Sequence, residues 1–134
     1  MNRNETREFM MQLLFQMEAQ NEFNQEMKEK AYKEKEGLRA QKSYVENVFN
    51  AILEHKEDID KLLEESSQNW KITRMNKVDL AILRLACAEI LYMDDIPVSV
   101  SINEAINLAK KFGADESSKF INGILGKVAS KDAQ

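Results

Sequence analysis

The chain has 134 residues, with 19 Lys and Arg against 23 Asp and Glu, so its formal net charge is −4. This length is typical of one domain, which we expect to span residues 1–134. A single cysteine excludes an internal disulfide, and one cysteine with one histidine excludes the usual Cys/His zinc sites. The longest stretch without a charged residue, residues 9–17, is too short to span a membrane.

The acidity is confined to one segment. Residues 41–70 carry 3 basic and 7 acidic side chains, which accounts for the whole net charge. An acidic chain is an unusual nucleic-acid binder, but here the two ends can present basic surfaces while the middle repels phosphate. The net charge alone therefore does not exclude RNA as a partner.

Apolar residues recur with the spacing i, i+3, i+4, i+7 in four segments, which predicts amphipathic helices and an all-α fold. These segments are residues 10–17, 45–52, 102–109 and 121–128. A weaker helix, rich in Glu and Lys, is expected within residues 24–36. A short helix around residues 59–63 should follow a break near His55. The pattern predicts a compact bundle of about seven helices.

Residues 78–92 are apolar on every side of a helix, which is typical of a buried helix. We therefore expect a central helix at about residues 77–93, wrapped by the others. Arg84 and Glu89 interrupt it, and because buried charges must be paired, we assign both a structural role. Asp79 lies near the helix start, where its charge suits the helix dipole, and we expect it to be exposed.

Residues 96–102 alternate like a strand, but Pro97 and the lone occurrence favour an extended linker. Ser101 and Glu104 then match a capping box that opens the next helix. Gly113 is expected to end that helix, and Asp115 to cap the last one.

The sequence carries no signal for catalysis. Its four glycines do not form a phosphate-cradling loop. Cys87 lies in the predicted buried helix with no histidine nearby in sequence, which is typical of a core side chain. His55 is interpreted as a surface residue at a helix end. We expect no catalytic residue, no metal and no cofactor.

Several residues fit a purely structural interpretation less well. Arg3 and Arg7 are one helical turn apart and form either a mixed charged surface or a small phosphate-contacting patch. Phe15 lies off the apolar stripe of its helix, so it packs on another helix or anchors a partner. Phe112 and Lys119 are close in sequence, as in sites where a base stacks on an aromatic ring while lysines meet phosphates.

Five sequence motifs are distributed along most of the chain. They are Ile96-Pro97, residues 101–113 (SINEAINLAKKFG), residues 118–125 (SKFINGIL), residues 79–86 (DLAILRLA) with Glu89, and an opening helix with Arg3, Arg7, Gln12, Leu14, Phe15 and Gln16. Together these motifs resemble the NusB family of bacterial transcription antitermination factors. The run from Asn103 to Gly123 is specific for the family, whereas residues 20–70 are not.

The resemblance implies an all-helical fold with two small subdomains packed together. It implies a cytoplasmic protein, with no membrane partner, that binds the boxA element of nascent transcripts, chiefly ribosomal RNA leaders. It also implies a heterodimer with NusE, a small-subunit ribosomal protein, in a complex that helps RNA polymerase resist termination. A homodimer through the same partner surface is a further expectation.

The resemblance also implies site residues. RNA would be met by basic residues of the opening helix and by the loop that enters the last helix, which gives Arg3, Arg7, Phe112, Glu116, Ser117 and Lys119. The protein partner would be met by an aromatic residue of the first helix and an acid of the central helix, which match Phe15 and Asp79.

The chain departs from the family at its start. Many members open with a dense arginine cluster, whereas this chain has only Arg3 and Arg7. Fewer phosphate contacts mean weaker binding and a shallower salt dependence. We therefore hypothesise that NusE supplies much of the RNA surface.

Two other functions remain open. Some ribosomal RNA cytosine methyltransferases carry an N-terminal RNA-recognition domain that resembles NusB. The absence of a cofactor-binding segment up to Gln134 leads us to expect a stand-alone protein instead. The second alternative is a purely structural helical adaptor without RNA binding.

Overall fold

The computed structural model describes residues 1–133, and this part of the chain contains helices and no strand. The α-helices are α1 (Arg3–Gln20), α2 (Gln25–Glu34), α3 (Lys42–Ser66), α4 (Lys77–Tyr92), α5 (Val98–Phe112) and α6 (Ser117–Asp132). Two short 3-10 helices, η1 (Arg39–Gln41) and η2 (Ile72–Arg74), precede α3 and α4. The predicted all-α fold is confirmed. None of the helices within residues 1–133 combines the length and apolar character that a membrane crossing requires.

Asparagine caps determine where the first two helices begin. Asn2 caps α1: its side chain accepts from the Glu5 amide at 2.8 Å, and the Glu5 carboxylate accepts from the Asn2 amide at 3.0 Å. Asn24 caps α2 through its side chain alone, which accepts from the Met27 amide. The expected helix within residues 24–36 is therefore present, and it is tied to α3 because buried Lys28 pairs with Glu46 at 2.9 Å.

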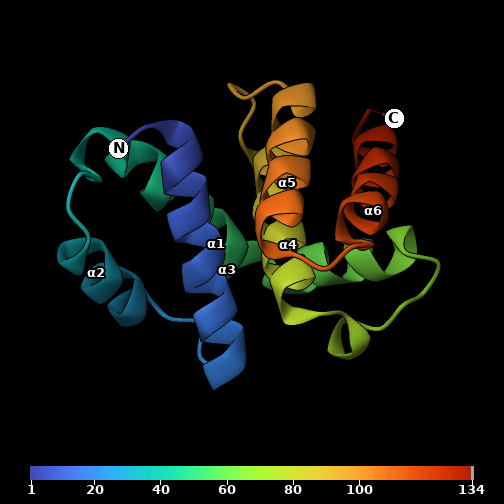
Figure 1. Cartoon of the computed structure of the whole chain (residues 1–134), viewed down its shortest axis with the longest axis horizontal. Coiled ribbons are helices and arrows are strands. Elements are labelled where there is room, and N and C mark those ends of the chain that lie inside the picture. The colour runs from blue at the N-terminus through green and yellow to red at the C-terminus, as the bar shows by residue number, and fades with distance from the viewer. Residues whose placement is uncertain (134) are drawn as a thin grey trace.

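The break predicted near His55 is a kink inside one helix. His55 has φ −114° and ψ 19°, which is outside the helical region, yet α3 continues on both sides of it. This continuity is why residues 1–133 contain six α-helices where we expected about seven helices. The kinked α3 passes behind α1 and then reaches the α6 side of the molecule (Figure 1).

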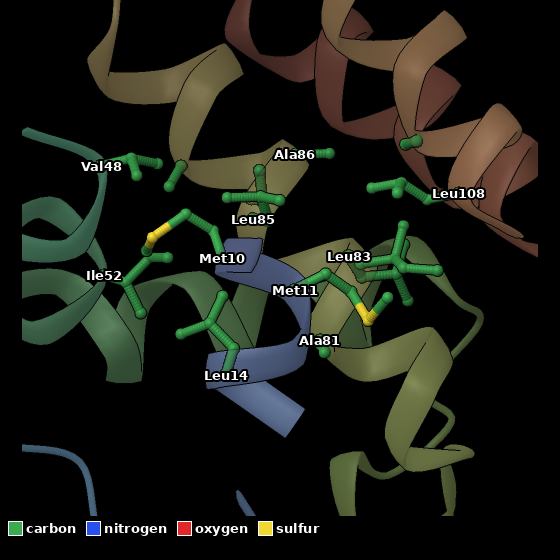
Figure 2. Close-up of a cluster of buried hydrophobic side chains, with 14 of the residues drawn as sticks. Met10, Met11, Leu14, Val48, Ile52, Ala81, Leu83, Leu85, Ala86 and Leu108 are labelled. Carbon is green, nitrogen blue, oxygen red and sulfur yellow. The ribbon is translucent and has the colours of Figure 1, made fainter. Parts of the chain in front are cut away.

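Helix α4 is the centre of the fold, as its all-round apolar pattern predicts. It packs against α1, α3, α5 and α6. Figure 1 shows α1 and α2 on one side of it and α6 on the other, so α4 lies between the two groups of helices. In Figure 2, Met10, Met11 and Leu14 of α1 point toward Ala81, Leu83 and Leu85 of α4 and toward Val48 and Ile52 of α3. Burial of this apolar surface is the main stabilising contribution.

The start of α5 differs from the sequence prediction. Residues 98–102 are not a linker, because α5 begins at Val98 directly after Pro97. A proline at a helix start costs no backbone hydrogen bond, since the first amides of a helix have no intrahelical acceptor. Ser101 is consequently inside the helix, and its hydroxyl donates to Glu89 at 2.8 Å instead of capping. Gly113 ends α5 as expected.

The cap expected from Asp115 is also absent. Helix α6 begins at Ser117, with Glu116 in the N-cap position and no side-chain cap. The hydroxyl of Ser117 instead accepts from the Ala114 amide at 2.9 Å, which closes the loop between α5 and α6.

The two charges predicted to be structural in α4 are both buried and paired. Arg84 donates to Asp60 of α3 through two nitrogens at 2.9 Å and to Glu18 of α1 at 2.6 Å. Burial lowers the pKa of Arg84, but its hydrogen bonds to Asp60 and Glu18 outweigh this and raise the pKa above its usual value. The ion pairs thus hold α1, α3 and α4 together at one end of the interface.

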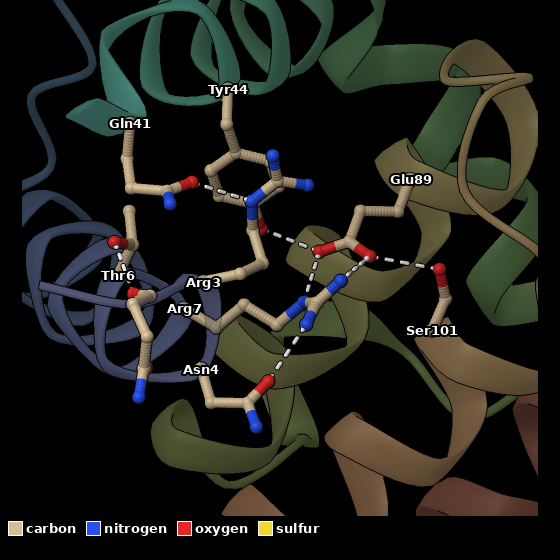
Figure 3. Close-up of polar contacts among 9 residues, drawn as sticks. Arg3, Asn4, Thr6, Arg7, Gln41, Tyr44, Glu89 and Ser101 are labelled. Atoms are coloured by element: carbon tan, nitrogen blue, oxygen red, sulfur yellow. Dashed lines mark hydrogen bonds and ion pairs between the residues drawn. The ribbon is translucent and has the colours of Figure 1, made fainter.

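Glu89 holds a second and larger buried cluster, shown in Figure 3. Its carboxylate accepts from Arg7 of α1 at 2.9 and 3.0 Å, from the hydroxyl of Tyr44 of α3, and from Ser101 of α5. Glu89 is 1% exposed and Arg7 is 4% exposed. Four helices therefore meet at one carboxylate whose hydrogen-bonding capacity is filled.

We predict that Glu89→Gln lowers the free energy of unfolding by about 3–5 kcal/mol, because it leaves Arg7 buried without a counter-charge. Urea unfolding followed by circular dichroism measures the change. Glu57→Gln, at an exposed position of α3, serves as the control and should stay within about 0.5 kcal/mol of the parent. A loss below 1 kcal/mol for Glu89→Gln would contradict the structural role of the cluster.

A second prediction concerns alkaline pH. Burial raises the pKa of the Cys87 thiol from 9.0 to about 12. The thiol therefore ionises first in the unfolded chain, so its contribution to stability is complete below about pH 9 and falls as the pH rises toward 12. Cys87→Ala should show a shallower loss of stability between pH 9 and 10 than the parent. Equal slopes of stability against pH for the two proteins would contradict Cys87 ionisation as a cause of the loss. Above pH 10 Tyr44 adds to the loss, because its pKa is also raised, first by burial and then by Glu89.

Candidate functional site

The two arginines of the opening helix have different surroundings. Arg7 points into the molecule, where it pairs with Glu89 and donates to Asn4 at 3.0 Å. Burial lowers its pKa, but the hydrogen bond and charge of Glu89 outweigh this and raise it. Arg7 therefore remains charged at every physiological pH, with its guanidinium engaged inside the fold.

Arg3 is partly exposed and is held at the surface. Its Nε donates to the side-chain oxygen of Gln41 at 2.7 Å, and its guanidinium lies 4.4 Å from the centre of the Tyr44 ring. Stacking and the single hydrogen bond fix the plane of the guanidinium while its terminal nitrogens stay away from the Glu89 cluster (Figure 3). Of the two predicted phosphate contacts, Arg3 is the one whose geometry suits an external anion.

The four other residues expected to meet RNA lie around the loop between α5 and α6. Glu116 and Lys119 are exposed, Phe112 is half-buried, and Ser117 is buried because it closes the loop. Gly113 is needed here, since a Cβ at this position would lie 2.7 Å from the Ala109 carbonyl oxygen and from Ser117. The loop is therefore tightly folded, with an exposed lysine and a half-exposed ring on its surface.

One ion pair links this loop to the opening helix. Lys111, in the last turn of α5, lies 2.6 Å from Glu8 of α1 and 5.3 Å from the centre of the Phe112 ring. The structure thus brings the end of α5 beside α1, although the two are more than 100 residues apart in sequence.

The two residues expected to meet a protein partner, Phe15 and Asp79, differ in how far they are exposed to solvent. Phe15 is 38% exposed, large for an aromatic side chain in a packed helix. Asp79 is only 7% exposed, so the expectation that it is exposed is wrong. Its Oδ1 is buried and makes no hydrogen bond among residues 1–133. Burying a carboxylate oxygen without a partner is costly, which makes Asp79 an unusual surface-proximal residue.

Asp79 lines a groove that the sequence did not reveal. Its walls come from η2, the start of α4 and the α5–α6 loop, and its lining residues are Trp70, Arg74, Met75, Asn76, Asp79, Ala114, Glu116, Ser117 and Phe120. The groove therefore brings Asp79 together with Glu116 and Ser117, which sequence analysis had placed in a different site.

Trp70 is the residue that sequence analysis missed here. It is 53% exposed and packs edge-on against Phe120, with ring centres 6.2 Å apart. Gln68 and Asn69 directly before it have φ of 59° and 67°, a left-handed turn that ends α3 and directs the chain into the groove wall. The sequence did contain one signal for this site: Trp70 is the single tryptophan and lies outside every amphipathic helix pattern.

Residues 1–133 contain no group of three or more His, Cys, Asp or Glu side chains arranged to hold a metal ion. Cys87 is buried in the core, and His55 stacks on Tyr92 with ring centres 4.2 Å apart. The features at the surface are an anchored arginine, an exposed lysine, and a groove with an unpaired carboxylate oxygen.

Comparison with known proteins gives a consistent result. The model of the NusB family matches residues 4–130. The transcription antitermination protein NusB of Alkaliphilus oremlandii is 48% identical over 98% of this chain and 96% of its own length. A structure of T. maritima NusB superposes with a TM-score of 0.87 at 31% identity, covering 98% of this chain and 92% of that one.

A further solved structure shares the fold at lower identity. It belongs to a complex of the antitermination factors NusB and NusE with dsRNA, and its matching chain has a TM-score of 0.85 at 22% identity over 96% of both chains. The family match over nearly the whole sequence, together with the relative matched end to end, establishes that this chain belongs to the NusB family.

Proposed function

We propose that this chain is an RNA-binding transcription antitermination factor that binds boxA RNA together with NusE and helps RNA polymerase resist termination, notably in ribosomal RNA operons. In this proposal residues 1–134 act as a single NusB-like RNA-binding domain in the cytoplasm, and by binding instead of catalysis. The A. oremlandii relative is named an antitermination protein and is matched over 96% of its length. This favours the proposal over a methyltransferase accessory domain or a purely structural adaptor.

The single observation that carries the proposal is the unpaired carboxylate oxygen of Asp79. A buried carboxylate is stabilised when a donor or cation completes its hydrogen bonds, and no side chain of the described chain does so. The groove around it is open and has aromatic walls from Trp70 and Phe120. These properties support a protein partner, here NusE, that brings a hydrogen-bond donor or a cation to Asp79. Phe15, exposed on α1, is the proposed apolar anchor of the same interface.

For RNA, the support comes from the surface chemistry of α1 and the α5–α6 loop. We assign phosphate contacts to Arg3 and Lys119, a stacking role to Phe112, and polar contacts to Glu116. Arg7 and Ser117 act indirectly in this scheme, because they fix the position of α1 and of the loop. Because only Arg3 and Lys119 are assigned phosphate contacts here, the monomer is expected to be a weak RNA binder.

The RNA proposal predicts that boxA RNA binds far more tightly to the complex with NusE than to this chain alone. The reason is that the proposed RNA surface of this chain has few cations, so much of the phosphate-contacting surface must come from its partner. Filter binding with a boxA oligonucleotide, with and without NusE across a series of salt concentrations, measures the difference. NusE alone is the necessary control. Equal affinity with and without NusE would contradict the cooperative surface.

The partner proposal predicts opposite effects of Asp79→Asn on binding and on stability. Association with NusE should weaken by roughly tenfold or more, because a buried charged hydrogen bond at the interface is lost. The free protein should remain as stable as the parent or become more stable, since an unpaired buried charge is removed. Calorimetric titration with NusE and thermal unfolding measure the two effects. Asp115→Asn, at an exposed loop position, is the matched control. Unchanged affinity for NusE would contradict the assignment of Asp79.

A further inference from the structure

The turn that leads into α3 is folded against the start of the chain. Gly37 has φ +87°, a left-handed conformation that favours glycine, and a Cβ there would lie 3.4 Å from the main-chain nitrogen of Met1. Four residues later, Gln41 accepts the hydrogen bond from Arg3. Two independent contacts therefore fix residues 37–41 beside the first turn of α1.

This arrangement places Arg3 beside a turn whose neighbouring residues include two further cations. Arg39 and Lys42 are exposed and flank Gln41, which holds Arg3. Within residues 1–133, none of Arg3, Arg39 and Lys42 forms an ion pair with a carboxylate. We call these three residues the N-terminal cationic surface.

The carboxylates near this surface are largely engaged elsewhere. Glu5 accepts from the Asn2 amide as part of the helix cap. Glu8 pairs with Lys111 at 2.6 Å.

Two acids on neighbouring segments complete the local charge balance. Glu29 is close enough to Lys42 for that charge to contribute to its lowered pKa, but its main partner is Lys28 at 2.5 Å, whose hydrogen bond and charge are the larger causes. Glu36, exposed beside Gly37, is the acid that opposes the cations within the turn itself. The free charge presented by Arg3, Arg39 and Lys42 is therefore positive, although the chain as a whole is acidic.

We propose that Arg39 and Lys42 join Arg3 in binding the phosphate backbone of RNA, so that the turn before α3 replaces the cation that Arg7 withdraws into the fold. This inference rests on the proposed RNA-binding function and adds two residues to its surface. An arginine presents planar paired donors and a lysine a point charge, and both are suited to phosphate oxygens.

RNA suits this surface better than an acidic protein. Protein interfaces have an apolar core inside a polar rim, but the large exposed apolar side chains of this chain are at other positions: Phe15, Trp70, Tyr92, Val98 and Val100. A phosphate backbone requires cations at intervals along its path and no apolar core. Arg3, Arg39 and Lys42 lie at a helix start and in the turn segment beside it, and they supply such cations.

The test is RNA binding by the Arg39→Gln/Lys42→Gln double variant in complex with NusE. Filter binding is measured across a salt series with a boxA oligonucleotide and with a scrambled RNA of equal length. Each lost phosphate contact lowers the slope of log affinity against log salt concentration by about 0.7 for a single strand, so the double variant should lose about 1.4. Because phosphate contacts carry no sequence information, both RNAs should weaken by the same factor.

Lys61→Gln/Lys127→Gln removes two exposed cations from other surfaces and is the matched control. It should keep the parent slope, and thermal unfolding should show that all variants remain folded. The inference would be overturned if Arg39→Gln/Lys42→Gln kept the salt-dependence slope of the parent while Arg3→Gln reduced it. That outcome would leave the RNA-binding function intact. No binding of either RNA by the parent complex would overturn both. A loss of boxA binding alone, with the scrambled RNA unaffected, would contradict a role in backbone contact.

Discussion

The buried carboxylate of Glu89 is the interaction on which the arrangement of helices depends. Arg7, Tyr44 and Ser101 reach it from α1, α3 and α5. In an interior of low dielectric constant, such a charge is tolerated only when its hydrogen bonds are complete. Each of the three helices must therefore stand in the register that brings its donor to Glu89. The pairs of Arg84 with Asp60 and Glu18 impose the same condition further along α4.

This constraint also determines what the opening helix shows to the outside. Because Arg7 is turned inward, the same helix leaves Arg3 at the surface, stacked on the ring of Tyr44 that itself donates to Glu89. The structural cluster and the proposed RNA surface thus share Tyr44 as a common support. The proposed phosphate contacts then fall on Arg3 and on the turn anchored by Gln41, and Glu8 and Glu18 of α1 are already engaged in internal pairs.

Helix α4 carries two acids with opposite roles. Glu89 has all its hydrogen bonds supplied from within the chain, whereas Asp79, ten residues earlier, has a buried oxygen without a partner. The difference comes from position: Glu89 lies where four helices converge, and Asp79 lies at the edge of a groove. The satisfied acid stabilises the fold, and in our proposal the unsatisfied one is a contact for another molecule. A protein partner at Asp79 would complete what the fold leaves open.

The sequence by itself determined the helices, the central position of α4 and the internal pairing of Arg84 and Glu89, because helical periodicity and the cost of a buried charge act locally. It failed where tertiary contacts override local chemistry. Ser101 has the pattern of a cap, but Glu89 takes its hydroxyl; Asp79 has the pattern of a surface acid, but the loops around it bury it. The positions of Trp70, Arg39 and Lys42 in the fold were likewise not predicted from the sequence. Only the tertiary structure decides which turn folds against which helix, because those contacts join residues that are distant in sequence.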